Sequence, residues 1–200
     1  MGAEKGMAEK SNKIRLYSAQ SKKLVGKIQS EGVCFSKKDY IESKYGESAK
    51  IFLAAYRWLA REAPKYVPKP EGAEFHYWAF AGTIDIEADG ESSVLVMDIP
   101  VEECLLFNLY DWNKILKLQY IGKDEQEETL FREQIKAMGI KHDSDIMLIN
   151  FYPDLKKEIE NSWQSLFRYH EQLIKNERPI KAVEGALWQI RNEWISEVRS

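Results

Sequence analysis

The 200-residue sequence contains few cysteines, prolines and glycines, and it has no long apolar run. Two Cys, six Pro and eleven Gly exclude a disulfide framework and a collagen-like chain. No apolar stretch approaches the roughly 20 residues that span a bilayer, which excludes a membrane protein. Hydrophobic residues make up 44% of the chain and charged residues 30%, and this excludes a disordered chain, which lacks the apolar surface that offsets ordering entropy. The composition indicates a soluble globular protein.

Common catalytic and metal-binding motifs are absent as well. The sequence has no G-x-S-x-G elbow, no phosphate-binding loop and no G-x-G-x-x-G. It has neither a C-x-x-C pair nor H-E-x-x-H, so we predict no metal site and interpret the acidic stretch at 142–145 as a solvated turn. Cys34 and Cys104 indicate reduced thiols in a cytoplasmic protein. Two lysines near Cys34 would favour a reactive thiolate, but we expect this thiol to be buried and inert.

The net charge of −3 argues against non-specific binding to nucleic acids or membrane surfaces. The charge is uneven, since residues 1–30 carry seven Lys and Arg against two Glu, whereas residues 85–111 carry eight carboxylates and no Lys or Arg. We interpret the two stretches as solvated faces of opposite sign. Two alternatives stay open: a basic patch that contacts a ligand phosphate, and a nucleic-acid end binder that uses Lys22, Lys23 and Lys27.

Apolar periodicity and turn signals predict an α+β fold, with a small central β-sheet flanked by several helices. We expect strands at 14–17, 75–81, 93–99 and 104–107, and a hairpin turn at 89–90. We expect helices at 21–32, 51–59, 111–118, 124–138, 153–167 and 179–198, and a further helix start at Ser36. Residues 1–13 read as a disordered lead-in, and residues 14–200 as a single domain.

The last helix is predicted from one spacing pattern. Val183, Leu187, Ile190, Trp194 and Val198 recur at intervals of 4, 3, 4 and 4 residues, which is typical of one helix face. The Trp side chains of the two C-terminal helices, Trp163, Trp188 and Trp194, are predicted to lie in the core.

The most informative polar residues lie on apolar, β-rich segments. They form a candidate ligand pocket: Arg15, Tyr17, Gln20, His76, Trp78, Asp98 and Asp111. Arg15 and Tyr17 share one face of the first predicted strand, and His76 and Trp78 share one face of a central strand. The alternative is a structural ion pair of Arg15 with Asp98 or Asp111, because a charge inside an apolar run is costly unless it is paired. No catalytic residue is assigned.

Several short segments spread over residues 14–195 form a recognisable pattern. In chain order they are 15–20 (R-L-Y-S-A-Q), 77–80 (Y-W-A-F), 94–100 (ending in I-P), 111–112 (D-W), 162–167 (beginning S-W) and 186–194 (A-L-W-Q-I-R-N-E-W). This pattern resembles an uncharacterised bacterial domain-of-unknown-function family that starts with R-L-W-x-x-Q. The chain departs from it at Tyr17, where Trp is usual, and at Glu184, where Gln is expected. The resemblance implies no activity and no functional residue.

A second resemblance concerns the layout of the N-terminal half. A first strand bears Arg15, a helix closes with Glu-Gly-Val at 31–33, and a later strand reads V-L-V-M-D-I-P. This order is similar to ADP-ribosyltransferase-type domains and RNA 2′-phosphotransferases. The resemblance implies that Arg15 contacts NAD and that Tyr17 or Trp78 stacks on nicotinamide. Such domains need a catalytic Glu on a late strand, and we expect no strand of this chain to supply one.

We therefore predict a cytoplasmic domain that binds a small molecule or a protein partner, without a cofactor, as a monomer or a dimer. The alternative is an ADP-ribosyltransferase-like domain that acts on NAD, a nucleotide or a nucleic-acid end. The two differ in geometry, because the transferase needs Arg15, Tyr17 and Trp78 in one concave pocket with an acid nearby.

Overall fold

The computed structural model describes residues 12–39, 41, 46, 49–83, 86 and 89–199. The expected lead-in lies outside the described residues up to residue 11, and Lys13 already belongs to the first strand. The described part of the chain combines a six-stranded antiparallel sheet, a two-stranded sheet and several helices. The predicted α+β class is confirmed.

The large sheet has the spatial order β5-β6-β3-β1-β4-β8. Its strands are β1 (Lys13–Ser21), β3 (Tyr77–Phe80), β4 (Ser92–Pro100), β5 (Leu105–Asn108), β6 (Val183–Leu187) and β8 (Ile195–Arg199). The small sheet pairs β2 (Val33–Phe35) with β7 (Gln189–Arg191). Strand β6, from the end of the chain, thus lies between β5 and β3, and β8 forms the edge of the sheet beside β4.

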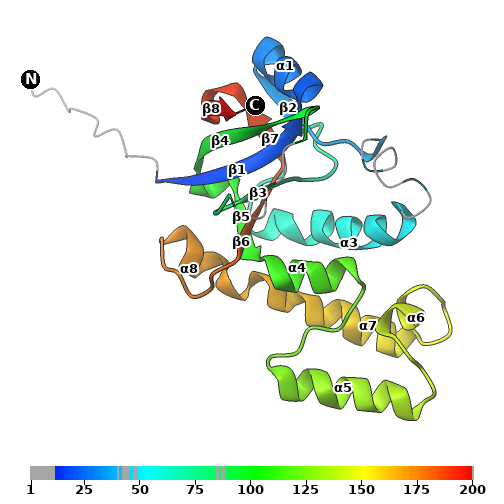
Figure 1. Ribbon diagram of the computed structural model, residues 1–200. Helices are drawn as coiled ribbons and strands as arrows, with labels where there is room; N and C mark the ends of the chain where they lie inside the picture. Colours follow the sequence, from blue (N-terminus) through cyan, green and yellow to red (C-terminus); the bar gives the residue numbers. More distant parts are fainter. Residues whose placement is uncertain are drawn as a thin grey trace, which may run out of the picture.

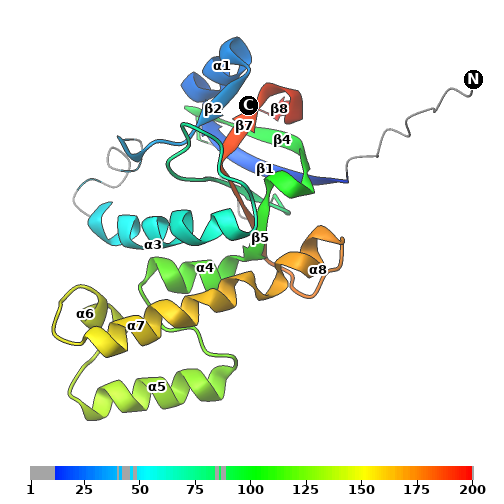
Figure 2. The same cartoon turned by 180° about the vertical axis from the view of Figure 1, so that it is seen from behind.

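Helices lie on both sides of the large sheet. They are α1 (Lys22–Glu31), α3 (Ala49–Glu62), α4 (Leu109–Leu116), α5 (Glu125–Ala137), α6 (Asp143–Met147), α7 (Pro153–Ser162) and α8 (His170–Ile174), with the 3-10 segments η4 (Trp163–Tyr169) and η5 (Asn192–Trp194). In both views α1 lies on one side of the sheet, and α3, α4, α7 and α5 follow one another on the other side (Figure 1, Figure 2). None of the helices in the described ranges is long and apolar enough to cross a membrane.

The central ladder of the sheet joins β1 to β4. The two strands pair without interruption from Lys13↔Pro100 to Ser21↔Ser92. Side chains alternate along β1, so that Leu16 is fully buried and its neighbours are not. The predicted strands at 14–17 and 93–99 are confirmed. A turn precedes β4, since Ser92 N donates to Asp89 O at 3.1 Å, but the predicted hairpin is wrong, because β1 lies between β3 and β4 in the sheet.

Helix α1 follows β1 directly because the sequence supplies both of its ends. The Ser21 hydroxyl accepts a hydrogen bond from Leu24 N at 3.3 Å and caps the first turn. Gly32 ends the helix with φ of 80°, a left-handed conformation that glycine adopts without strain. Val25 and Ile28 are buried against the sheet, as the apolar stripe of this helix predicted.

The predicted helix at 179–198 is wrong. This segment forms β6, β7, η5 and β8 instead. Strand β6 lies between β5 and β3, so all five of its residues are buried and the alternation that marks a half-exposed strand is lost. An apolar spacing of 4 and 3 residues then fits a helix as well as a buried strand. Trp188 and Trp194 are nevertheless core residues, as predicted, and so is Trp163.

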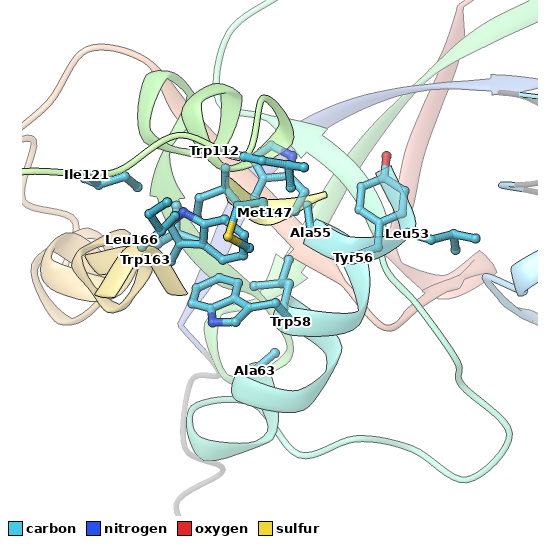
Figure 3. Packing of buried hydrophobic residues seen from close by; sticks show 14 of the residues in the cluster. Leu53, Ala55, Tyr56, Trp58, Ala63, Trp112, Ile121, Met147, Trp163 and Leu166 are labelled. Atoms are coloured by element: carbon cyan, nitrogen blue, oxygen red, sulfur yellow. The ribbon is translucent and has the colours of Figure 1, made fainter. Parts of the chain in front are cut away.

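The large sheet separates two apolar cores. On the helical side, Trp58 packs edge-on against Trp163 at 5.4 Å, and Trp112 stacks on Tyr56 at 5.8 Å (Figure 3). On the α1 side the core includes Leu16, Ile28, Leu95, Leu187, Ile190 and Trp194. Aromatic pairs of this kind add to the stabilisation that area burial provides.

Replacing Gly185 of β6 with Ala is expected to destabilise the fold. A Cβ at this position would lie 2.8 Å from Cys104 Sγ and 2.9 Å from Leu16 Cδ1, so both neighbours must shift, at a cost of about 1–3 kcal/mol. Urea unfolding measures this change. The matched control is Gly26→Ala on α1, where a Cβ meets no atom within 4 Å and a helix gains up to about 1 kcal/mol. Equal stability of the two variants would contradict the packing of β6.

Candidate functional site

Arg15 and Asp98 form an ion pair on the outer face of the β1–β4 ladder. They are direct neighbours in the register, and Arg15 donates from Nε to Oδ1 at 2.8 Å and from Nη2 to Oδ2 at 2.7 Å. Hydrogen bonding to Arg15 lowers the pKa of Asp98 below its usual value. The predicted structural pair with Asp98 is therefore confirmed, and the alternative partner is wrong, because Asp111 accepts from Arg168 Nη2 at 2.9 Å.

Tyr17 lies on the same face, beneath a second bidentate ion pair. Arg199 donates to both carboxylate oxygens of Glu197 at 2.9 and 3.0 Å, and its guanidinium lies 5.8 Å from the centre of the Tyr17 ring. Val96, between these side chains in the register, is only 2% exposed. Long charged side chains thus cover this part of the sheet in place of a helix.

Gln20 has a structural role inside the sheet. Its Nε2 donates to the Ser18 hydroxyl at 2.7 Å, and that hydroxyl donates to the backbone oxygen of Trp78 at 2.5 Å. Gln20 and Ser18 are both buried. The two residues therefore tie β1 to β3 at a place where the strand register pairs only Tyr17 with Phe80.

His76 and Trp78 point into aromatic packing. The His76 ring lies 3.7 Å from the Trp188 ring, and the Trp78 ring lies 4.9 Å from Trp112 and 5.3 Å from Tyr56. Burial lowers the pKa of His76 to about 3, so this side chain is neutral in the folded protein at neutral pH. Both residues contribute to the core.

A cleft of about 340 Å³ runs along the N-terminal half of β1. It is lined by Asn12, Lys13, Ile14, Arg15, Tyr17, Ala81, Val101, Leu173, Ile174, Asn176 and Arg178. The cleft exists because β3 pairs with β1 only at Tyr17, which leaves the edge of 13–16 without a described partner strand on that side. Helix α8 and the chain that follows it lie across the gap (Figure 1). We call this feature the β1 cleft.

The β1 cleft is electropositive. Three of its lining residues, Lys13, Arg15 and Arg178, are cationic, and its described lining contains no Asp or Glu. Asp98 neutralises Arg15, whereas Lys13 and Arg178 form no salt bridge within the described part of the chain. Apolar side chains from β1 and α8 make up much of the remaining wall. Such a site can bind a carboxylate or a phosphate through guanidinium and ammonium donors.

The structure brings together only part of the predicted pocket. Arg15 and Tyr17 line the β1 cleft, whereas Gln20, His76, Trp78, Asp98 and Asp111 are not among its lining residues. Sequence reasoning missed Lys13, Asn176 and Arg178. Arg178 lies just before the segment that was predicted to be a helix, and no local pattern places it opposite β1.

Glu184 corrects one expectation about the late strands. It lies on β6, is 3% exposed, and pairs in register with Phe80 and Phe107. A late strand therefore does carry a glutamate, contrary to the sequence prediction. Glu184 is two strands away from Tyr17, and neither it nor Trp78 lines the β1 cleft. The ADP-ribosyltransferase-like alternative is not favoured.

The cysteines and the acidic turn form no reactive centre. Cys34 and Cys104 are buried, and burial raises the pKa of both thiols, so neither has thiolate character. Asp143 and Asp145 accept backbone hydrogen bonds from Tyr120 and His142. Within the described ranges, no group of three or more His, Cys, Asp or Glu side chains could hold a metal ion.

The buried histidine predicts a pH dependence of stability. The unfolded chain binds a proton at His76 below pH about 6.5, whereas the folded protein does not until about pH 3. The free energy of unfolding that depends on a neutral His76 is therefore fully present above pH 6.5 and is lost as the pH falls towards 3. At pH 4.5 the loss amounts to about 2–3 kcal/mol. Urea unfolding at pH 7 and 4.5 should show a smaller loss for His76→Phe than for wild type. The control variant His142→Gln changes an exposed histidine and should lose as much stability between pH 7 and 4.5 as wild type. If His76→Phe also loses as much stability as wild type, a buried neutral His76 is refuted.

Comparison with known proteins identifies the family of this chain. No curated protein and no solved structure matches the chain. Residues 15–196 match a family described as Domain of unknown function (DUF3841), and this range runs from Arg15 on β1 into β8. It includes β1 from Arg15 onward, the whole of β4, and the Arg15 and Arg178 positions of the β1 cleft. Because the match covers most of the sequence, the chain belongs to this family of unknown function.

Proposed function

We propose that this domain binds a small ligand with a carboxylate or phosphate group in the β1 cleft. The observation that carries the proposal is the charge of the cleft. Lys13 and Arg178 line it without a described salt-bridge partner, beside the paired Arg15, and no described lining residue is acidic. An anion is the ligand that compensates this charge.

The size and walls of the cleft limit the ligand further. Its volume of about 340 Å³ lies near the lower end of the roughly 300–1,000 Å³ usual for ligand pockets. Ile14, Val101, Leu173 and Ile174 supply an apolar wall. The proposed ligand therefore has a compact apolar part and one anionic end, and a cofactor is not part of the proposal.

Arg178 is the residue best suited to contact the anion. Its only described hydrogen bond runs from Nη1 to the backbone oxygen of Glu177 at 3.3 Å. Within the described part of the chain its remaining donors form no hydrogen bond or salt bridge, whereas Arg15 uses two nitrogens on Asp98. We therefore propose that Arg178 contacts the anion directly and that Lys13 attracts it at longer range.

A cytoplasmic location is part of the proposal. It is supported by two buried thiols, Cys34 and Cys104, that are not joined in a disulfide, because unpaired cysteines are typical of reducing compartments.

Thermal-shift measurements with wild type and Arg178→Gln test the proposed site. The probes are benzoate and phenyl phosphate, which combine a compact apolar part with one anionic end, and inorganic phosphate, AMP, NAD, ATP and a 5′-phosphorylated RNA oligonucleotide. A probe at about 100 times its Kd adds about 2.7 kcal/mol, which corresponds to roughly 5–10 °C in Tm for a chain of this size. We expect at least one anionic probe to give such a shift in wild type and to lose most of it in Arg178→Gln.

The matched control is Lys175→Gln, which removes one positive charge nearby. Lys175 is exposed and is not a lining residue of the β1 cleft, so this variant should keep the full shift. Equal shifts in wild type and Arg178→Gln would refute the site. No shift with any probe at millimolar concentration would refute anion binding.

A further inference from the structure

The open edge of β1 presents backbone groups to the β1 cleft. Val101 N donates to Asn12 O at 3.0 Å, so the carbonyl of Asn12 points towards the β4 side of the ladder. In an antiparallel ladder the N–H and C=O of one residue point to the same side, and the side alternates from residue to residue. Lys13 and Arg15 therefore point their backbone N–H and C=O groups away from β4 and towards the cleft.

Two further observations support this orientation of the β1 backbone. Pro100 lies opposite Lys13 in the register and has no N–H, which fits a pair that exchanges no hydrogen bonds. On the other edge, β3 pairs with β1 only at Tyr17, whose backbone groups point the same way as those of Lys13 and Arg15. In the described ranges, no hydrogen bond reaches the backbone of Lys13 or Arg15 from the cleft side. An edge of this kind can pair with another strand.

The walls of the β1 cleft suit a strand whose side chains alternate between apolar and polar. Ile14 and Leu173 are buried in the core on the α1 side, and Ile174 packs against the same core, whereas Lys13 and Arg15 are exposed. A strand beside β1 would place every second side chain near the apolar wall and the others towards solvent. Asn12 Nδ2 donates to Ile174 O at 3.2 Å. The start of β1 and the end of α8 are thus joined, so the walls need little rearrangement when a ligand binds.

We infer that the ligand of the β1 cleft is an extended peptide segment that carries a carboxylate and pairs with the open edge of β1. This inference rests on the proposed function, since it names the ligand class of the same site. In complexes of this kind, backbone pairing supplies affinity and the alternate side chains supply specificity. The carboxylate is selected by charge, because Lys13 and Arg178 line the cleft without a described salt-bridge partner and no described lining residue is acidic. The open stretch of 13–16 matches a segment of about four residues.

Short peptides test the ligand class by isothermal titration calorimetry with the full chain. Two probes carry one carboxylate, as the chain end in acetyl-Thr-Val-Thr-Val or as a side chain in acetyl-Thr-Val-Glu-Val amide. The control is the uncharged acetyl-Thr-Val-Thr-Val amide. We expect at least one carboxylate peptide to bind at least about tenfold more tightly than the control in wild type and in Lys175→Gln, and to lose this advantage in Arg178→Gln. Equal binding of all three peptides to wild type would overturn the inference.

Backbone methylation separates strand pairing from simple anion binding. The N–H groups of neighbouring residues in a strand point to opposite sides, so only every second one faces β1. The tighter peptide is therefore made in two forms, N-methylated at its second or at its third residue. We expect one form to bind at least about tenfold more weakly than the parent peptide, because it loses a backbone hydrogen bond, and the other form to bind like the parent. Equal affinities of the two forms would overturn strand pairing.

Amide hydrogen exchange locates the pairing on β1. The amides of Lys13 and Arg15 should exchange at least about tenfold more slowly when the peptide is bound. Ile14 and Leu16 serve as internal controls, because their N–H groups face β4 and should be protected with and without peptide. Unchanged exchange at Arg15 in the presence of saturating peptide would overturn the inference.

The inference and the proposed function fail in different ways. If benzoate or phenyl phosphate raises the Tm of wild type but not of Arg178→Gln, the cleft binds anions. In that case, absent peptide binding or equal affinities of the two N-methylated forms would overturn the peptide inference alone. If none of the anions and none of the peptides bind, both are overturned.

Discussion

The register between β1 and β4 determines how the rest of the molecule is arranged. Nine consecutive residue pairs join the two strands, and this register fixes which side chains of β1 face the α1 core and which face outward. It places Arg15 directly opposite Asp98. A shift by one residue would turn Leu16 to the surface and Arg15 into the core. The β1 cleft depends on the same ladder. Strand β4 pairs with β1 over its whole length, whereas β3 pairs with β1 only at Tyr17 and leaves residues 13–16 open on the other edge.

The strongly perturbed titratable groups belong to the structure rather than to a ligand site. Burial alone would raise the pKa of Glu62, but hydrogen bonds from Lys65, Arg61 and Gln164 lower it to about 2 and tie α3 to η4. His170 Nδ1 accepts from Leu106 N on the edge strand β5, and burial lowers the pKa of this histidine. The cations of the β1 cleft, in contrast, are exposed. In this protein the candidate site is therefore identified by uncompensated charge in a concave surface, not by a shifted pKa.

Local patterns in the sequence were sufficient for the class of the fold, for β1, β4 and α1, and for the expectation that Arg15 pairs with a carboxylate, Asp98 or Asp111. These features depend on alternation, capping residues and the cost of an unpaired charge, all of which act between close neighbours or obvious complements. The strands after residue 182 could not be predicted, because β6 is buried on both faces and its apolar spacing also fits a helix. Only the tertiary structure decided that Arg178 and Lys13 line the same cleft at the open edge of β1. Contacts between residues so distant in sequence depend on how strands from both ends of the chain are ordered in one sheet, and no local pattern encodes that order.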